Sequence, residues 1–452
     1  MSTEASASDV SATSVGMESQ GYTSRSLLKV SIASSIGTMI DWYDFLLSAL
    51  AASIVYPTVF FSFSANPALA FSLSIASYSL AFIVRPIGSF LFGHYGDRMG
   101  RKSTLILTLL TMGVGTLGIG LTPSYAAIGF AAPALLFLFR FFQGLGIGGE
   151  WGGAATWVSE FTSKSKWKAL WNSGMQAGLL VGFVLAVVLI TLLSTNLTHA
   201  AFLSWGWRIP FFVGAVIVLV GGILRYTTAE SPVFNSLKKQ GKVERSPAIK
   251  SWRMMGGRIL LLAVAWNFVT MAFSFIWIPY SAIYASTVKI SANTVLIGEL
   301  VASFVMIITT FLGSYVSDRF GIRRKYLLFT GAIGTAALAF PMFYAIDTGN
   351  ATLVVLGMAA FMGVDFIGYG VMSSLWSEQF PPEYRYSGSG QAYNIAAIVV
   401  GVAGAFLTPV AISLYGIRGA MPYLNITYII DAIICAFVIL FIKEPKRVKF
   451  GA

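Results

Sequence analysis

Apolar residues dominate the chain and occur in long runs that short polar segments separate. A helix needs about 20 consecutive, mostly apolar residues to cross the hydrocarbon core of a bilayer. Twelve runs reach that length, so the pattern predicts an all-α membrane protein with twelve transmembrane helices. We expect these helices near residues 28–56, 68–92, 103–122, 127–159, 169–194, 206–228, 257–286, 294–317, 326–346, 351–377, 388–415 and 422–442.

The composition supports a membrane protein. Hydrophobic residues make up 56% of the chain and charged residues only 11%, whereas soluble domains carry about 25% charged residues. The single cysteine, Cys435, excludes a disulfide within the chain, and the two histidines are far apart. We therefore expect neither a metal nor a cofactor. Residues 1–24 are rich in Ser, Thr and Ala and are expected to form a disordered tail, not a signal peptide.

The placement of the basic residues predicts the orientation of the chain. The net charge is +12, but most Lys and Arg residues fall in every second loop and at the two ends. Cytoplasmic loops of membrane proteins carry such an excess of Lys and Arg. We expect a multi-pass protein of the cell membrane with both termini in the cytoplasm and no nucleic-acid partner.

Two charged hairpins half a chain apart, at residues 93–102 and 318–325, indicate an internal repeat. Each contains an acid and is followed by a glutamate, Glu160 or Glu378, that ends a long apolar run. The repeat predicts two pseudosymmetric six-helix bundles in the same orientation. The expected parts are a tail over 1–24, an N-terminal bundle over 25–228, a cytoplasmic central loop over 229–256, a C-terminal bundle over 257–443 and a cytoplasmic tail over 444–452.

The hairpins have the chemistry of a gate. Their glycines allow tight backbone geometry, and Asp97 is placed to accept N–H bonds from the end of a neighbouring helix. Arg98 and Arg101 are expected to pair with Glu160. Plain positive-inside charge is the simpler alternative, but glycine and acid at these spacings favour a gate. The candidate gating residues are Gly93, Asp97, Arg98, Gly100, Arg101, Glu160, Asp318, Arg319, Gly321, Arg323, Glu378 and Arg385.

Several ionisable residues lie inside the predicted spans, where a charge costs at least ~2.5–3.5 kcal/mol. We expect Arg85 to pair with Glu150, and Arg140 to face the first-helix carboxylates or a substrate anion. Poor hydration favours a protonated carboxyl and a nearby arginine favours an ionised one, which suits proton coupling. The structural alternative is a static ion pair that fixes helix packing. The candidates for proton coupling are Asp41, Asp44, Asp365 and Glu150.

Polar and aromatic residues within the spans are the candidates for a substrate cavity, in which the arginines would attract an anion. Each aromatic residue is individually more typical of packing or of an interface anchor. The candidate substrate-binding residues are Arg140, Arg85, Gln143, Trp42, Tyr43, Asn172, Gln176, Asn267, Gln391 and Asn394.

Five stretches follow one another from the first predicted helix to the eleventh. They are Asp41-Trp42-Tyr43-Asp44-Phe45, Arg85-Pro86-Ile87-Gly88, Arg140-Phe141-Phe142-Gln143-Gly144 with Gly148-Gly149-Glu150, Trp205-Gly206-Trp207-Arg208-Ile209-Pro210-Phe211-Phe212, and Phe380-Pro381-Pro382-Glu383-Tyr384-Arg385-Tyr386-Ser387. Together they resemble the metabolite:proton symporter family of the major facilitator superfamily. The resemblance implies two bundles around a central cavity and proton-coupled uptake of organic acids or of zwitterions such as betaine. It also implies a part for Arg140 in substrate binding or proton coupling.

The chain departs from the family pattern at three positions. The first-helix acid is usually Glu where this chain has Asp41, and Ile322 interrupts the second hairpin, so that gate is expected to be looser. Asp365 is an acid that the family's tenth helix does not lead us to expect. A family substrate therefore cannot simply be carried over.

These features predict a secondary transporter that imports a small polar metabolite, an organic acid anion, by proton symport with alternating access. Its partners would be the substrate, protons and the lipid bilayer, and it would work as a monomer. A proton-independent uniporter or exchanger and a non-transporting membrane sensor are the alternatives. An enzyme is disfavoured because no cluster of reactive residues is apparent.

Overall fold

The computed structural model describes residues 24–272, 279–288, 290–402 and 407–444. Over these ranges all regular secondary structure is helical, which confirms the predicted all-α class. The predicted N-terminal tail lies outside the described residues, apart from Ser24, and so does the C-terminal tail after Glu444.

The six predicted spans of the first half each coincide with a helix or a helix pair. These are α1 (Ser24–Ile54), α3 (Pro67–Met99), α4 (Arg101–Leu121), α6 (Ala131–Phe161), α7 (Lys168–Gln176) with α8 (Gly178–Asn196), and α10 (Ile209–Tyr226). The short elements α2 (Tyr56–Val59), α5 (Tyr125–Ile128), α9 (His199–Ser204) and η1 (Gly206–Arg208) lie in the connections.

The second half follows the connecting helix α11 (Pro232–Lys239). Its helices are α12 (Pro247–Met271), α13 (Pro279–Thr287), α14 (Ala292–Phe320), α15 (Arg324–Asp347), α16 (Ala351–Asp365), η3 (Phe366–Gly368), α17 (Tyr369–Glu378), η4 (Pro382–Tyr384), α18 (Arg385–Val402) and α19 (Thr408–Leu440). The predicted break between the last two spans is a bend inside α19, where Gly416 has a φ of 70°. That positive φ is accessible to glycine and strained for other residues.

Ten helical segments of the described chain are long and apolar enough to cross a bilayer. The helices α1, which carries two carboxylates, and α18, which is rich in glycine and polar residues, complete the twelve. Exposed positions on the outer helices are apolar, for example Val216, Leu219 and Ile223 of α10. Such an exposed apolar surface is what a bilayer covers.

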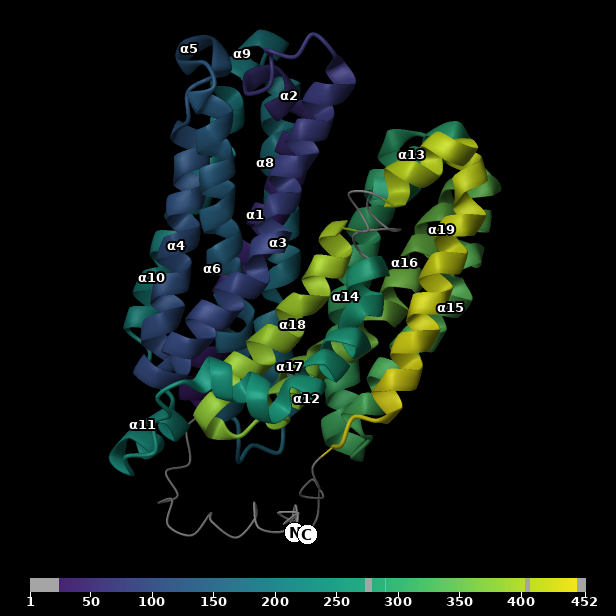
Figure 1. Ribbon diagram of the computed structural model, residues 1–452. Coiled ribbons are helices and arrows are strands. Elements are labelled where there is room, and N and C mark those ends of the chain that lie inside the picture. Colours follow the sequence, from purple (N-terminus) through teal and green to yellow (C-terminus); the bar gives the residue numbers. More distant parts are fainter. Residues whose placement is uncertain (1–23, 273–278, 289, 403–406, 445–452) are drawn as a thin grey trace.

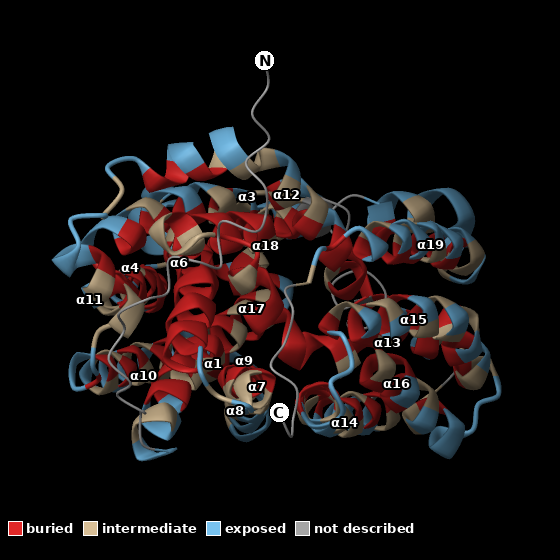
Figure 2. Ribbon diagram, turned by 90° about the horizontal axis from the view of Figure 1, so that it is seen from below, coloured by how far each residue is buried: buried red, intermediate tan, exposed pale blue. Residues whose placement is uncertain are grey.

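The helices form two groups (Figure 1). Helices α1 to α10 make one bundle and α12 to α19 the other, and the buried residues face the interior of the bundles and the region between them (Figure 2). The bundles lie close together at the end where α1 begins and α19 finishes, which we call the terminal end, and they diverge at the opposite end.

Glycines permit the close helix packing within the N-terminal bundle. A Cβ at Gly178 or Gly182 of α8 would overlap the backbone of α1 at Ser35 or Met39. In the same way, a Cβ at Gly144 or Gly148 of α6 would overlap carbonyl oxygens of α3, one of them that of Arg85. Small residues let transmembrane helices approach one another, and here they position α1 and α3 around the centre of the molecule.

Candidate substrate site

A pocket lies between the two bundles near their middle. Its volume is about 60 Å³, so in this conformation it is narrower than most small-molecule sites. Its charged residues are Asp41 of α1 and Arg85 of α3. The other lining residues are Thr38, Trp42, Phe45, Phe82, Ile147 and Trp151 from the first bundle and Trp266, Val269, Thr270, Phe366, Tyr369, Tyr393 and Ala397 from the second.

The two charged groups of the pocket are incompletely bonded. Asp41 is 9% exposed and its Oδ1 atom has no hydrogen-bond partner within the described chain. The Nε atom of Arg85 also has none, while its guanidinium lies 4.7 Å from the centre of the Phe82 ring. Buried polar atoms are normally satisfied, so a carboxylate and an arginine with spare capacity mark a place where a polar ligand can bind.

Stacked aromatic rings bring the two bundles together beside the pocket. Trp151 of α6 stacks on Tyr393 of α18 with ring centres 4.0 Å apart and planes at 11°. Trp266 stacks on Tyr369 within the second bundle, with ring centres 5.4 Å apart. Nearby, Asn394 donates a hydrogen bond of 2.8 Å to the carbonyl of Gly148 in the opposite bundle.

A second polar cluster is enclosed in the N-terminal bundle and does not line the pocket. Asp44 accepts hydrogen bonds from Thr116 (2.6 Å) and Gln143 (3.3 Å). Arg140 donates to Gln143 (2.7 Å), to Ser48 (2.6 Å) and to the carbonyls of Ser77 (3.3 Å) and Tyr78 (3.0 Å). Arg140 thus reaches the first-helix carboxylate through Gln143, and its polar atoms are already engaged.

Glu150 does not pair with Arg85, so that expectation was wrong. Its carboxylate forms an ion pair with Arg225 of α10 and accepts a hydrogen bond of 2.8 Å from Thr108. Arg225 also donates to the carbonyl of Leu105 at 2.8 Å. In the sequence Arg225 stands just before the central loop, where basic residues are common. It was therefore counted as a loop residue and not as a partner of Glu150.

The predicted substrate residues are divided by the structure. Arg85 and Trp42 line the pocket, whereas Tyr43 is buried with its hydroxyl on the Pro210 carbonyl. Asn172 bonds to Ser159 and to the backbone of Lys168, Asn267 bonds to Asp431 at 2.6 Å, and Gln391 accepts from Ser251. Gln176 is buried. The pocket residues Phe45, Phe82, Tyr369 and Tyr393 were not predicted, because single aromatic residues in a span carry little information.

Asp365, predicted for proton coupling, lies at the end of α16 inside the C-terminal bundle and not in the pocket. It is fully buried, and neither carboxyl oxygen has a hydrogen-bond partner among the described residues. Tyr428 of α19 is one of the polar residues near its carboxyl group.

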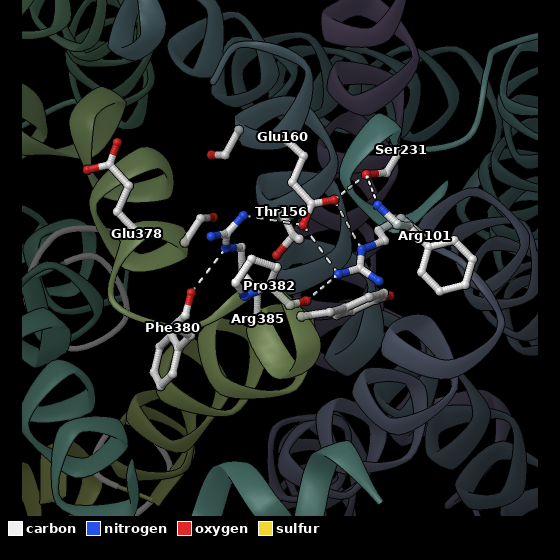
Figure 3. A network of polar contacts seen from close by, with 12 residues as sticks. Arg101, Thr156, Glu160, Ser231, Glu378, Phe380, Pro382 and Arg385 are labelled. Carbon is white, nitrogen blue, oxygen red and sulfur yellow. Dashed lines mark hydrogen bonds and ion pairs between the residues drawn. The ribbon is translucent and has the colours of Figure 1, made fainter. Parts of the chain in front are cut away.

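The terminal end is closed by two charged clusters. The Glu160 cluster consists of Glu160, Arg101, Asp97 and Arg385. Figure 3 shows Glu160 between the two arginines. Arg101 pairs with both acids at 3.2 Å and donates to the carbonyl of Pro382 in the opposite bundle at 2.8 Å. Arg385, also from the opposite bundle, lies 3.4 Å from Glu160.

Asp97 makes the contact that the sequence predicts. Its carboxylate accepts hydrogen bonds from the backbone N–H groups of Tyr386 (3.1 Å) and Ser387 (2.8 Å) at the start of α18. Of the two bases that were expected to pair with Glu160, Arg101 does so, whereas Arg98 is exposed. A Cβ at Gly93 would come within 2.7 Å of the Ser387 Cα atom, so this glycine lets α3 and α18 approach. Gly100 has a φ of 117°, so this position also favours glycine.

The Glu378 cluster is the counterpart in the second half. Glu378 pairs with Arg324 at 2.7 Å and with Lys168 of the first bundle at 2.8 Å. Asp318 accepts a hydrogen bond of 2.9 Å from the backbone of Leu170 at the start of α7. Arg323 and Arg319, the predicted gating bases, are exposed. The buried base is Arg324, which follows Gly321 by three residues, whereas Arg101 follows Gly100 directly. The second hairpin is therefore two residues longer than the first.

Two helical bundles that enclose a central pocket and are bridged at one end by ion pairs define a membrane transporter. The model of the Major Facilitator Superfamily matches residues 44–404, and the chain therefore belongs to this superfamily. An inner membrane metabolite transport protein of Escherichia coli (strain K12) is 37% identical over 377 residues, which cover 82% of this chain and 84% of that protein. The shikimate transporter of the same strain is 34% identical over 424 residues, covering 93% and 95%.

Structural comparison agrees with the family. The solved structure of the proton:xylose symporter XylE bound to 6-bromo-6-deoxy-D-glucose superposes with a TM-score of 0.76 over 94% of this chain and 97% of that chain, at 18% identity. Membership of this superfamily makes the protein a multi-pass membrane protein and a secondary transporter of small molecules, not an enzyme.

Proposed function

We propose that this protein imports an organic acid anion by proton symport. The observation that carries the proposal is the pocket between the bundles, where Asp41 and Arg85 lie among aromatic residues and each has a polar atom without a hydrogen-bond partner among the described residues. A guanidinium suits a carboxylate because it presents paired donors to paired acceptors. The aromatic rings suit the apolar body of the substrate.

The two charged groups explain how substrate and proton are coupled. Arg85 and Asp41 line the same pocket, and a nearby arginine favours the ionised form of a carboxyl. A substrate carboxylate that binds Arg85 offsets this attraction and adds negative charge. Both effects favour proton uptake by Asp41, so anion and proton bind together. Asp44 and Asp365 are further candidates for proton binding, and Arg140 holds Asp44 in place through Gln143.

The clusters at the terminal end act as the gate. They join the bundles on the side that, by the placement of the basic residues, faces the cytoplasm, while the opposite end diverges (Figure 1). This arrangement corresponds to an outward-facing state with both termini in the cytoplasm. The transition to an inward-facing state breaks the contacts of Glu160 with Arg385 and of Glu378 with Lys168. Each chain contains both bundles and the pocket, and we propose that it works as a monomer.

Reconstitution in liposomes tests the proposal. Uptake of labelled shikimate, 2-oxoglutarate, citrate, glycine betaine and D-xylose is measured with and without an inward proton gradient. Accumulation of one carboxylate that a protonophore abolishes supports symport. Gradient-independent equilibration supports a uniporter or exchanger, and absence of uptake across the panel leaves a membrane sensor as the better interpretation.

The Asp41→Asn variant gives the sharper test. Symport requires that this variant lose proton-driven accumulation but keep exchange of labelled for unlabelled substrate, because exchange needs no net proton movement. Asp44→Asn serves as the comparison, since Asp44 lies outside the pocket. Unchanged accumulation by Asp41→Asn contradicts the proposed role of Asp41.

A further inference from the structure

The ion pair between Glu150 and Arg225 is deeply buried in the N-terminal bundle. Glu150 is 1% exposed and Arg225 is fully buried. Hydrogen bonds from Thr108 to Glu150, and from Arg225 to the carbonyls of Leu105 and Ala33, complete the site. A buried pair of this kind contributes little net stability compared with apolar residues of similar size, so its presence calls for another explanation.

In the second half of the internal repeat, uncharged residues stand at the places equivalent to this pair. Arg101, Glu160 and Glu230 occupy places equivalent to those of Arg324, Glu378 and Glu444. Counted from these anchors, Thr108, Glu150 and Arg225 correspond to Gly331, Gly368 and Ile439 of the second half. Where the N-terminal bundle has the ion pair and its threonine, the C-terminal bundle therefore has two glycines and a buried isoleucine.

Helix α1 packs against the ion pair and also carries Asp41, the carboxylate that lines the pocket. A Cβ at Gly37 would overlap both Glu150 Oε1 and Arg225 Nη2, so the backbone of α1 lies directly on the ion pair. Asp41 is four residues further along the same helix, about 6 Å in rise. Asp41 therefore lies about one helical turn from the point where α1 packs on the ion pair.

We propose that Glu150 and Arg225 form a positioning pair that tunes proton binding at Asp41. Arg225 and Thr108 hold the Glu150 carboxylate in place, and a negative charge near a carboxyl disfavours its ionisation. Glu150 then influences coupling without carrying the proton itself. This inference rests on the proposed proton symport. The other titratable or charged groups that face the two carboxyls are Arg85, Asp44, Tyr369, Tyr386 and Tyr393.

A titration of the purified protein in detergent tests the pair without a known substrate. Trp42, Trp151 and Trp266 line the pocket beside Asp41, so tryptophan fluorescence reports its protonation. We expect a transition that Asp41→Asn removes. Glu150→Gln is expected to move this transition to lower pH by about one unit. The double variant Glu150→Gln/Arg225→Gln, which keeps a neutral hydrogen-bonded pair, is expected to move it in the same direction by less.

The control is the ion pair of Asp347 with Arg418, 2.7 Å apart and partly exposed. Its neutralisation as Asp347→Asn/Arg418→Gln is expected to leave the transition in place. Thermal unfolding in detergent shows whether each variant is folded. An unchanged transition in the folded double variant overturns the inference, because a structural pair leaves Asp41 unaffected. The inference is also overturned if the wild type shows proton-driven uptake but no transition that depends on Asp41. That result would leave the proposed symport itself standing.

Discussion

Two arginines of the N-terminal bundle have opposite surroundings. Arg85 lines the pocket, and its Nε atom has no hydrogen-bond partner in the part of the chain that the structure describes. Arg140, by contrast, is 2% exposed and donates four hydrogen bonds. A buried polar group with a free hydrogen-bonding atom is a candidate for binding a ligand, whereas one whose atoms are all hydrogen-bonded to the protein stabilises the fold. The two residues should therefore respond differently to the same substitution.

We predict that Arg85→Gln raises the apparent KM for the transported carboxylate at least tenfold. Hydrogen bonds to a charged group contribute about 1.5–3 kcal/mol, and the variant loses them only when substrate is bound. Its thermal unfolding temperature should stay near that of the wild type. Uptake kinetics in liposomes and unfolding in detergent measure the two quantities.

Arg140→Gln is predicted to behave in the reverse way. Removing it leaves Gln143, Ser48 and Asp44 without their present network, and breaking a buried charged network costs about 3–5 kcal/mol. We expect a lower unfolding temperature and a poor yield of folded protein. A stable Arg140→Gln protein with a raised KM would instead place Arg140 at the substrate.

At this scale the sequence indicates which charges lie in the membrane but not how they pair. Asp41, Arg85 and Glu150 were singled out because a charge inside a span is expensive. The partner of Glu150 was missed because Arg225 sits at a helix end, where a base is expected. Pairing depends on how the helices are rotated and packed, and spacing along one helix does not determine the rotation of another.

Helices α4 and α15 begin in the same way. The carboxylate of Glu230 accepts hydrogen bonds from the backbone of Arg101 (3.0 Å) and Lys102 (3.2 Å) at the start of α4. Glu444 accepts from Arg324 (2.9 Å) and Lys325 (3.4 Å) at the start of α15. A carboxylate at a helix N-terminus satisfies free N–H groups and interacts favourably with the helix dipole.

We predict that Glu230→Ala and Glu444→Ala each lower the free energy of unfolding by about 1–2 kcal/mol. The two effects should add, because the caps are in different bundles and share no partner. Unfolding in denaturant measures both variants and their combination. Glu244→Ala is the control, since its ion pair with Lys250 lies at the surface and such pairs contribute little. Equal losses for all three variants would argue against a specific capping effect.

The elements themselves were predictable because each span is long and apolar. The positions at which the helices are interrupted were harder to predict. The change from α16 through η3 to α17 around Asp365 does not follow from hydropathy, because it depends on contacts with neighbouring helices that a single run of residues does not reveal. The kink at Gly416 within α19, by contrast, falls between the last two predicted spans.

At the scale of the whole molecule, the two halves exchange basic residues across the interface. Glu160 of the first bundle receives Arg385 from the second, and Glu378 of the second receives Lys168 from the first. The repeat in the sequence predicted both acids and their place at helix ends. It did not predict the exchange, because each base closely follows the acid of its own half in the sequence, Lys168 eight residues after Glu160 and Arg385 seven residues after Glu378.

A disulfide across the terminal end should lock the proposed outward-facing state. Thr156 Oγ1 and Ser389 Oγ lie 3.2 Å apart in opposite bundles, close enough for cysteines to bond. In a Cys435→Ser background we predict that Thr156→Cys/Ser389→Cys loses uptake after oxidation and regains it with a reductant. The control pair, Ser159→Cys/Asn172→Cys, lies within one bundle at 2.9 Å and should stay insensitive to oxidation. Undiminished uptake by the fully crosslinked protein would show that transport does not require the bundles to separate at this end.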